Sequence, residues 1–371
     1  MKVVLLAPAS SIHTQRWADG LVARGLEVVV ATQHPSPSWP LEGGPRVLEL
    51  PFRGQLGYFL NGPALHRHLR VEEPDILNAH YASGYGTTAA LTRFFPSLLS
   101  VWGSDVFDFP RASKVKGRLL RGNLSSATRL ASTSEVMARH TRALVPQAPA
   151  PFVTPFGVDT SAFAPGPERD ASREVTIGMV KALYPKYGVD VLIRAMAVVG
   201  QTASARGRIR LKIVGEGPER SNLEALAARL GVSDVVQFAG AVPHAMVPDV
   251  LRELDVFVAS SRLDSESFGV AVVEASACGL PVVVSDVAGL SEVVSDGVTG
   301  YVVPRDDPRA LAQALSSLVG DPQLRRSLGL AGRALVEARY DWEHCLDTMI
   351  GAYRTTIDAG KDPRPTTSGE G

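Results

Sequence analysis

The sequence predicts an α/β protein with two doubly wound, Rossmann-like domains that face each other across a cleft. Three observations lead to this fold class. The chain has 371 residues, which is too many for one ordinary hydrophobic core. Short apolar strand patterns alternate with helical patterns through most of the chain, as is typical of an open parallel sheet covered by helices. A stretch rich in proline and small residues, 146–173, separates two such series and has the composition of a linker.

The two series predict an N-terminal domain over 1–160 and a C-terminal domain over 170–335. In the first, strands are expected at 3–8, 26–32, 75–80, 97–103 and 127–134, and helices at 14–25, 85–94 and 135–145. In the second, strands are expected at 174–180, 209–215, 235–240, 256–260, 281–286 and 300–304, and helices at 188–200, 219–231, 247–255, 268–279 and 307–321. A last helix is expected at about 340–358. The polar segment 359–371 lacks apolar periodicity and is expected to be disordered.

Composition and charge limit the functional classes. Hydrophobic residues make up 45% of the chain and charged residues 20%, as in globular proteins, and the formal net charge is zero. Bulk charge therefore gives no support to a nucleic acid partner, and none is predicted.

Cys278 and Cys345 have neither disulfide-framework nor metal-site spacing, which favours the reducing cytoplasm. No stretch is long and apolar enough to predict a membrane span. Peripheral contact with the inner face of a membrane stays open, although composition marks no lipid-facing patch.

The stretch "DSESFGVAVVEASACG", 264–279, contains the most informative motif. It places Glu266 and Glu274 on either side of an apolar run, just after a predicted strand. A helix is expected to begin near Phe268, Gly269 and Val270, where unpaired N–H groups and the helix dipole favour an anion. Eight helical residues rise about 12 Å, which predicts that the two carboxylates lie nearly on one side, far enough apart for a nucleotide sugar. Glu266 would hold sugar hydroxyls, the helix start would hold phosphate and Glu274 would accept from ribose. The alternative is a favourable dipole contact for Glu266 and a solvated Glu274.

The segment from Glu266 to Val282 resembles the E-x7-E motif of the retaining GT-B glycosyltransferases of family 4. Similar stretches in the linker and the second domain include "IVGEGPERSNLEALAARLGV", "VQFAGAVPHAMVPDVLRELDVFVASS", "DVAGLSEVVSDGVTGYVVPRDDP" and "PFGVDTSAFAP". In the first domain, "HTQRWADGLVARGLEVVVAT" and "LLSVWGSDVF" resemble one acceptor-domain branch of the family, so the resemblance covers nearly the whole chain. It implies a GT-B fold in which the first domain binds the acceptor, the second binds the donor, and the last helix crosses back to the first domain. It also implies retaining transfer of a hexosyl group from a nucleoside-diphosphate sugar, with UDP favoured and GDP next. The acceptor would be a hydroxyl of a saccharide, a lipid-linked saccharide or a small molecule. No cofactor and no catalytic metal are expected.

The resemblance also implies which residues form the donor site. Family members have an arginine and a lysine five residues apart that bind the leaving diphosphate, and this sequence has Lys181 and Lys186 there, with Tyr187 inserted before Gly188. A lysine neutralises charge but lacks the bidentate fork of arginine. The alternative is that both lysines are solvated surface residues. The predicted catalytic residues are Glu266, Lys181 and Lys186. The predicted donor-binding residues are Glu274, Ser267, Phe268, Gly269, Val270, Gly215, Gly240 and Val242.

In the first domain, polar residues that follow predicted strands are candidates for acceptor binding. His13 follows the first strand, and His80 and Tyr81 follow the strand at 75–80. Two alternatives stay equally open: His13 is a helix-start residue without a ligand, and His80 is an ordinary packed residue. Many relatives have a donor-contacting histidine where this chain has Trp102, and that role does not carry over to a tryptophan. Asp105 keeps its place in the pattern and is expected to accept from an acceptor hydroxyl.

Other enzyme classes that share doubly wound sheets fit less well. A nicotinamide dehydrogenase should have G-x-G-x-x-G after its first strand, and "APASSIHT" has no glycine. A phosphorylase should have a lysine for pyridoxal phosphate in a recognisable context, and none is evident. A sugar-nucleotide epimerase and a sugar-nucleotide-binding protein remain the alternatives. The Asp264-Ser265-Glu266 segment resembles an acidic metal site, but the family resemblance predicts no metal there.

Overall fold

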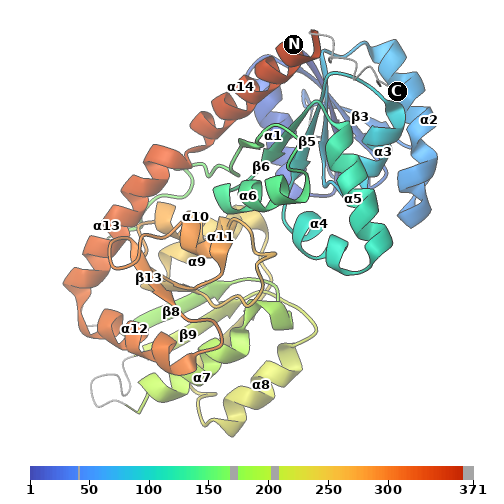
Figure 1. Ribbon diagram of the computed structural model, residues 1–371. Coiled ribbons are helices and arrows are strands. Elements are labelled where there is room, and N and C mark those ends of the chain that lie inside the picture. The colour runs from blue at the N-terminus through green and yellow to red at the C-terminus, as the bar shows by residue number, and fades with distance from the viewer. Residues whose placement is uncertain (41, 168–173, 202–208, 362–371) are drawn as a thin grey trace. The chain divides into compact units, whose positions relative to one another are not determined.

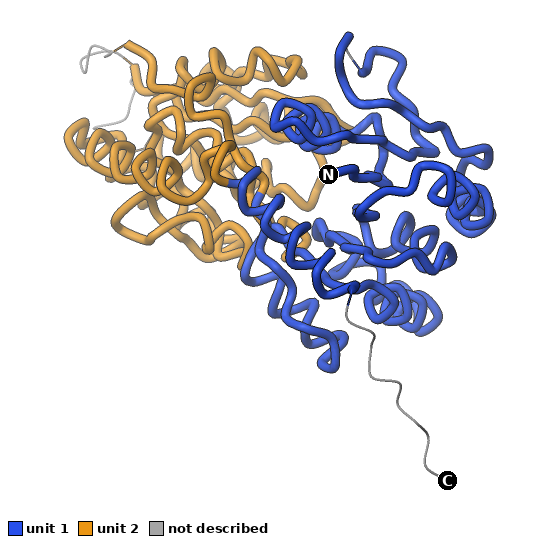
Figure 2. The backbone as a smooth tube through the Cα atoms, turned by 90° about the horizontal axis from the view of Figure 1, so that it is seen from above, with its two compact units in different colours: residues 1–155, 345–371 blue, residues 156–344 orange. Residues whose placement is uncertain are grey.

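The computed structural model describes residues 1–40, 42–167, 174–201 and 209–361 (Figure 1). The chain divides into two compact units (Figure 2). Unit 1 consists of residues 1–155 and 345–371, and unit 2 consists of residues 156–344. Each unit contains one parallel sheet with helices packed around it.

Unit 1 is built on a seven-stranded sheet with the order β3-β2-β1-β4-β5-β6-β7. Its strands are β1 (Lys2–Leu6), β2 (Glu27–Thr32), β3 (Arg46–Glu49), β4 (Ile76–His80), β5 (Ser97–Val101), β6 (Arg129–Ser132) and β7 (Phe152–Val153). Its helices are α1 (Ile12–Ala23), α2 (Gly54–Glu72), α3 (Tyr85–Thr92), α4 (Ser104–Phe107), η1 (Phe109–Arg111), α5 (Lys114–Ser126) and α6 (Glu135–Leu144). The central strands β4 and β5 are buried throughout, because helices cover both faces of a parallel sheet.

Unit 2 repeats the arrangement with a six-stranded sheet in the order β10-β9-β8-β11-β12-β13. Its strands are β8 (Val175–Val180), β9 (Ile209–Val214), β10 (Val236–Gly240), β11 (Val256–Ala259), β12 (Val282–Ser285) and β13 (Gly300–Val303). Its helices are η2 (Pro185–Tyr187), α7 (Val189–Val199), α8 (Arg220–Arg229), η3 (His244–Met246), α9 (Val247–Arg252), α10 (Val270–Ala277), α11 (Ala288–Glu292), α12 (Pro308–Gly320) and α13 (Pro322–Arg339). In each parallel sheet, the first three strands are added toward one edge and the later strands are added on the other side of the first strand, which is the Rossmann strand order.

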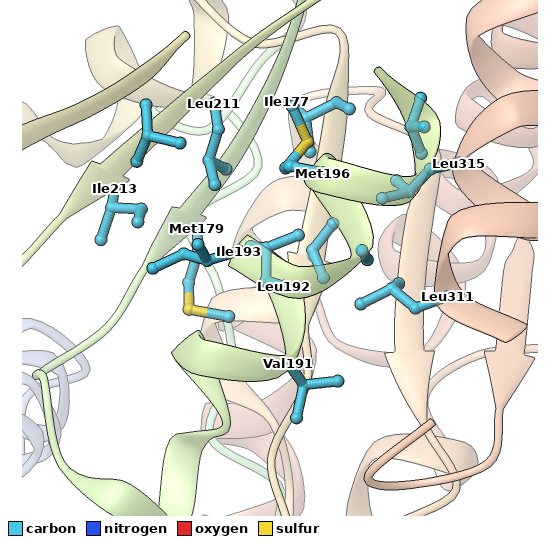
Figure 3. Packing of buried hydrophobic residues seen from close by; sticks show 14 of the residues in the cluster. Ile177, Met179, Val191, Leu192, Ile193, Met196, Leu211, Ile213, Leu311 and Leu315 are labelled. Atoms are coloured by element: carbon cyan, nitrogen blue, oxygen red, sulfur yellow. The ribbon is translucent and has the colours of Figure 1, made fainter. Parts of the chain in front are cut away.

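A continuous hydrophobic core holds the helices of unit 2 to its sheet. Figure 3 shows α7 turning Leu192, Ile193 and Met196 toward strand residues and toward Leu311 and Leu315 of α12. The three α7 side chains are fully buried. Burial of one such side chain contributes about 1.5–3 kcal/mol, so this core fixes the ends of the strands from which the site loops extend.

The structure corrects the predicted linker and tail. The stretch predicted as linker, 146–173, contains β7, whose Phe152 and Val153 pair with β6. The last helix, α14 (Trp342–Lys361), includes residues 359–361, which were predicted to be disordered. The buried residues of α14 recur every three or four positions as far as Thr356, and the helix continues beyond this apolar pattern to Lys361. Residues 362–371 lie outside the described part of the chain.

The helix α14 is a structural part of unit 1 from Cys345 onward. Tyr353 is fully buried there, and its hydroxyl donates to Asn78 Oδ1 in β4 at 2.9 Å. Unit 1 also contains α2 and α5, which the pattern analysis did not identify.

Candidate functional site

The centre of the candidate site in unit 2 is an ion pair between Lys181 and Glu266. Lys181 follows β8 and Glu266 lies in the loop after β11, at the carboxyl end of the sheet. Lys181 Nζ donates to Glu266 Oε1 at 2.7 Å, and the side chains are 27% and 15% exposed. Burial opposes the charge on Lys181, but Glu266 together with Tyr187 and Glu274 outweighs burial, so the pKa of Lys181 lies above its ordinary value. Lys181 is therefore charged at neutral pH, and both residues line one pocket together with Gly269.

The loop between Glu266 and α10 packs closely against α11. The helix begins at Val270, with Gly269 as its N-terminal cap at φ 74°. A Cβ on Gly289 of α11 would lie 2.3 Å from the carbonyl carbon of Ser267, so only glycine permits this approach. Because Glu266 precedes the helix by four residues, the predicted helical rise of about 12 Å between the two glutamates is wrong. The first N–H groups of α10 still have no helical acceptors and carry the positive end of the dipole.

The inserted Tyr187 brings the two predicted lysines together. Lys181 Nζ lies 4.6 Å from the centroid of the Tyr187 ring, and Lys186 Nζ lies 4.9 Å from it. Each ammonium group is within the range of a cation–π contact. The Tyr187 ring also lines the pocket of Lys181 and Glu266, so the insertion keeps both cations at one site.

Two arginines connect the loop of Lys186 with the loop of Glu266. The Arg262 backbone N–H donates to the Lys186 carbonyl at 2.8 Å, and Arg262 Nη2 donates to Asp190 Oδ2 at 2.9 Å. Arg305 Nη1 donates in turn to the Arg262 carbonyl at 3.1 Å and to Asp264 Oδ1 at 3.3 Å. Neither arginine was singled out from the sequence, because their partners are distant along the chain.

Glu274 is a buried residue with a specific partner. It is 5% exposed, which excludes the solvated alternative. Its Oε1 accepts from His244 Nε2 at 2.8 Å, and the ring of His244 lies 5.8 Å from that of Phe163. His244 is a functional candidate that sequence reasoning missed, although it lies two residues after the predicted Val242. Burial without a partner would destabilise the charged carboxylate, and His244 supplies that partner.

The remaining donor-site candidates shape the site through their backbone or through side-chain packing. Gly215 adopts φ +150°, and a Cβ there would lie 1.9 Å from the Lys181 carbonyl oxygen. Gly215 therefore permits close contact between the loops after β8 and β9, and its N–H donates to the Gly240 carbonyl at 2.8 Å. Val242 is partly buried in the loop after β10. Phe268 is 3% exposed and its ring packs against Tyr340 at 5.4 Å, so only its backbone is available to a ligand.

In unit 1, Trp102 lies at the centre of the predicted acceptor residues. Its indole is 5.8 Å from the ring of His13, 4.7 Å from that of His80 and 4.9 Å from that of Tyr81. Tyr81 has a left-handed backbone, at φ 69°, which is unusual for a non-glycine residue. The residue that replaces the family histidine thus becomes the aromatic centre of the cluster.

Two of the predicted acceptor residues are buried. Asp105 is 1% exposed, and its carboxylate accepts from the backbone N–H groups of Ala82, Trp102 and Gly103 at 2.8–3.1 Å. The expectation that Asp105 meets an acceptor hydroxyl is therefore corrected, because these bonds use the carboxylate to hold the loop around Trp102. His80 is also buried, and burial lowers its pKa to about 3, with a smaller effect from His13. Its Nε2 contacts Asn78 Oδ1 at 3.0 Å, while Nδ1 has no hydrogen-bond partner among the described residues.

The described residues contain neither a metal-ligand cluster nor a membrane-spanning helix. Among residues 1–40, 42–167, 174–201 and 209–361, no group of three or more His, Cys, Asp or Glu side chains is arranged to hold a metal ion. Within the same described ranges, no helix is both long and apolar enough to cross a bilayer.

Comparison with known proteins identifies the family. Residues 165–335 match the family described as glycosyl transferases group 1, and residues 2–134 match a glycosyl transferase 4-like family. The D-inositol 3-phosphate glycosyltransferase of Actinosynnema mirum is 30% identical over 406 residues, which cover 96% of this chain and 94% of that protein. The chain belongs to the group 1 glycosyltransferases. Several other matches to this group 1 glycosyltransferase span only about half of the relative's length. The enzyme of the same name from Segniliparus rotundus is 33% identical over 64% of this chain and 54% of its own length.

Solved structures show that this group 1 glycosyltransferase has the GT-B fold. Sucrose-phosphate synthase from Thermosynechococcus elongatus superposes with a TM-score of 0.83 at 23% identity, over 97% of this chain and 100% of that one. HepE from Anabaena in complex with UDP superposes equally well, with a TM-score of 0.83 at 18% identity, over 96% and 100% of the two chains. At these identities the comparison establishes the fold and leaves the chemistry to the residues of the site.

Proposed function

We propose that the protein transfers a hexosyl group from a nucleoside-diphosphate sugar to an acceptor hydroxyl, with retention at the anomeric carbon and without a metal ion. The observation that carries this proposal is the 2.7 Å contact between Lys181 Nζ and Glu266 Oε1, in a pocket that also includes Gly269 at the start of α10. The pocket offers a carboxylate to sugar hydroxyls, and it offers an ammonium group and helix N–H groups to a diphosphate.

The leaving diphosphate requires local cations, because the chain as a whole carries no net charge. Lys181 and Lys186 share the Tyr187 ring, so both are positioned to act on the same anion. Negative charge on the diphosphate grows as the glycosidic bond breaks, and fixed donors stabilise that charge most in the transition state. In this proposal the helix start near Gly269 supplies the remaining donors.

Glu274 would bind the ribose of the donor. A carboxylate accepts hydrogen bonds from vicinal hydroxyls, and His244 holds the Glu274 Oε1 atom at 2.8 Å, which leaves Oε2 for the sugar. His244 thus acts as a positioning residue for Glu274.

The reaction would proceed on one face of the sugar. The acceptor oxygen forms a bond to the anomeric carbon as the bond to the diphosphate oxygen breaks, and a diphosphate oxygen takes the proton of the acceptor hydroxyl. Lys181 occupies Oε1 of Glu266, which leaves Oε2 to accept from hydroxyls of the donor sugar. Attack from the face of the departing diphosphate retains the anomeric configuration.

UDP-sugars are the favoured donors and GDP-sugars are the next choice. A related GDP-mannose-dependent α-(1-6)-phosphatidylinositol monomannoside mannosyltransferase from Mycolicibacterium smegmatis is 33% identical over 51% of this chain, which supports the second choice. The acceptor would be a saccharide, a lipid-linked saccharide or a small molecule in glycan, glycolipid or natural-product biosynthesis. The aromatic cluster of Trp102, His13 and Tyr81 in unit 1 offers faces of the kind on which a sugar ring packs.

The proposal is tested first by a thermal-shift screen of nucleotides and nucleotide sugars. A ligand at a hundred times its dissociation constant stabilises the protein by about 2.7 kcal/mol, which is easily detected. The stabilising donor is then incubated with candidate acceptors, and proton NMR reads the anomeric signal of the product. An α-linked donor should give an α-linked product at a rate that chelator leaves unchanged. A β linkage would exclude the retaining mechanism, and strict dependence on a divalent ion would exclude the metal-free one.

The same assay separates the two alternatives. An epimerase would convert the donor sugar without an acceptor, and a nucleotide-sugar-binding protein would neither transfer nor slowly hydrolyse the donor. Transfer to an added acceptor would reject both alternatives.

A further inference from the structure

Three packed helices of unit 1 present an apolar and basic surface to solvent. We use the name helical face for the exposed side chains of α2, α3 and α5. Helix α3 packs against both α2 and α5, and Figure 1 shows the three helices together on one side of the unit. The Thr88 hydroxyl donates to the Tyr58 carbonyl at 2.8 Å, and Asn123 Nδ2 donates to Thr87 Oγ1 at 2.8 Å. These bonds join the three helices into one support.

The apolar part of the helical face follows the solvent-facing side of α2. Leu56, Phe59, Leu60 and Pro63 recur at three- and four-residue spacing and are all exposed. Leu56 is 72% exposed and Leu60 is 51% exposed. Leu91 of α3, 51% exposed, lies beside this row, because a Cβ on Gly62 would be only 2.7 Å from the Leu91 Cβ. Such a row of large apolar side chains is more than the scattered exposure expected of a monomer's surface.

The basic part of the helical face is concentrated on η1 and α5. Residues 109–126 contain five lysine and arginine residues and no aspartate or glutamate. Arg111, Lys114, Arg118 and Arg121 line a groove of about 530 Å³. Within the described part of the chain, no carboxylate forms an ion pair with any of these four residues. Arg67 and Arg70 continue the solvent-facing row of α2 and are also exposed.

We propose that the helical face docks on a membrane surface that contains anionic phospholipids. The apolar row on α2 would enter the boundary between headgroups and acyl chains, and the groove on α5 would receive lipid phosphates. A helix with leucine and phenylalanine beside arginine and lysine has the composition of an interfacial helix. Charge complementarity selects an anionic surface, because these cations are concentrated in a chain whose net charge is zero. This proposal is independent of the donor chemistry, since the helical face belongs entirely to unit 1.

The experiment is co-sedimentation of the full chain with vesicles of phosphatidylcholine, with and without phosphatidylglycerol. Binding should require phosphatidylglycerol and weaken as salt is raised. Each lysine or arginine near an anionic surface contributes about fivefold to the partition constant, so the triple variant Lys114→Gln, Arg118→Gln, Arg121→Gln should bind about a hundredfold more weakly. Leu56→Ser should also weaken binding, because it removes an apolar side chain from the interface.

Matched controls lie in unit 2. Arg194→Gln and Arg229→Gln remove exposed cations from α7 and α8, and Leu330→Ser removes a leucine of α13 that is 58% exposed. These controls should bind vesicles like the parent protein, and thermal melting checks that every variant is folded. No sedimentation with phosphatidylglycerol, equal binding to both kinds of vesicle, or unchanged binding of the triple variant would overturn the proposal. The proposal would also be overturned if the parent protein is a dimer that binds no vesicles and that Leu56→Ser dissociates. The surface would then be a protein interface. The nucleotide thermal-shift screen on the same samples tests the donor site separately.

Discussion

Replacing Lys181 with methionine removes the ammonium group that lies 2.7 Å from Glu266 and keeps most of the aliphatic stem. A hydrogen bond to a charged group contributes about 1.5–3 kcal/mol, and the pair here is largely screened from water. If the same ammonium group stabilises the departing diphosphate, kcat should fall by about ten- to hundredfold. KM should change less, because the charge on the leaving group is greatest in the transition state.

The assay is the initial rate of transfer under saturating donor, compared with Lys212→Met as the control. Lys212 lies in β9 of the same unit and forms an ion pair with Glu253, but it does not line the pocket of Glu266. The control separates loss of a lysine–glutamate pair in general from loss of this one. A folded Lys181→Met protein with the kcat of the parent would refute the role assigned to Lys181.

The pair should also have a defined pH dependence. The pKa of Lys181 is raised above its ordinary value of 10.5 in the folded protein, with burial opposing and Glu266 favouring the charge. Its contribution to stability is therefore fully present below 10.5 and is lost only as the pH rises through the higher folded value. The difference in unfolding free energy between the parent and Lys181→Met should accordingly be constant across neutral pH in denaturant titrations. If this difference in unfolding free energy disappears within about one pH unit of neutrality, the account of Lys181 is wrong.

Three further predictions concern other parts of the two units. Glu274→Gln should weaken binding of nucleoside diphosphate and of donor alike, by about tenfold or more in calorimetry. His244→Ala should weaken binding of both ligands less. Unchanged binding of both ligands to Glu274→Gln would remove Glu274 from the site. Gly289→Ala should lower activity, since its Cβ would lie 2.3 Å from the Ser267 carbonyl carbon and displace the loop of Glu266; wild-type rates would show that the loop adapts. His80 has a folded pKa of about 3 against 6.5, so the unfolded chain binds its proton first and stability falls as the pH drops between these values, by up to about 1.4 kcal/mol per pH unit. His80→Asn should flatten that slope in urea titrations, and an identical slope would reject the assignment.

The sequence alone was sufficient for the parts of the fold in which burial follows a local period. The strand at β8 and the helix α7 are examples, because "VTIGMV" and "VDVLIRAMAVV" bury side chains at the spacing of a strand and of a helix. Helix α2 was missed because its solvent-facing side carries leucine and phenylalanine, which removes the contrast between its two faces. Helix α5 was missed because four of its 13 positions carry cations, which obscures the apolar period.

The site was only partly predictable for a different reason. Glu266 was named from the spacing of its motif and Lys181 from the family resemblance, and the structure adds that they are in contact across 85 residues of sequence. His244 and Arg262 carried no motif, since each acts through a partner that the order of strands brings close. Asp105 was assigned to the wrong partner, because its position in the pattern does not reveal that three backbone N–H groups use its carboxylate.

The discontinuous composition of unit 1 has a consequence for its biosynthesis. Its sheet is complete once residue 155 has been made, but the helix that contains Tyr353 and Cys345, both fully buried, is synthesised nearly two hundred residues later. Until then, the side chain of Asn78 lacks the Tyr353 hydroxyl, and the apolar surface covered by α14 stays exposed on the ribosome. Unit 2 consists of one uninterrupted segment and has no such requirement. Unit 2 can therefore fold as soon as its own segment has emerged, while unit 1 also needs residues 345–361, and unit 1 expressed without these residues should aggregate.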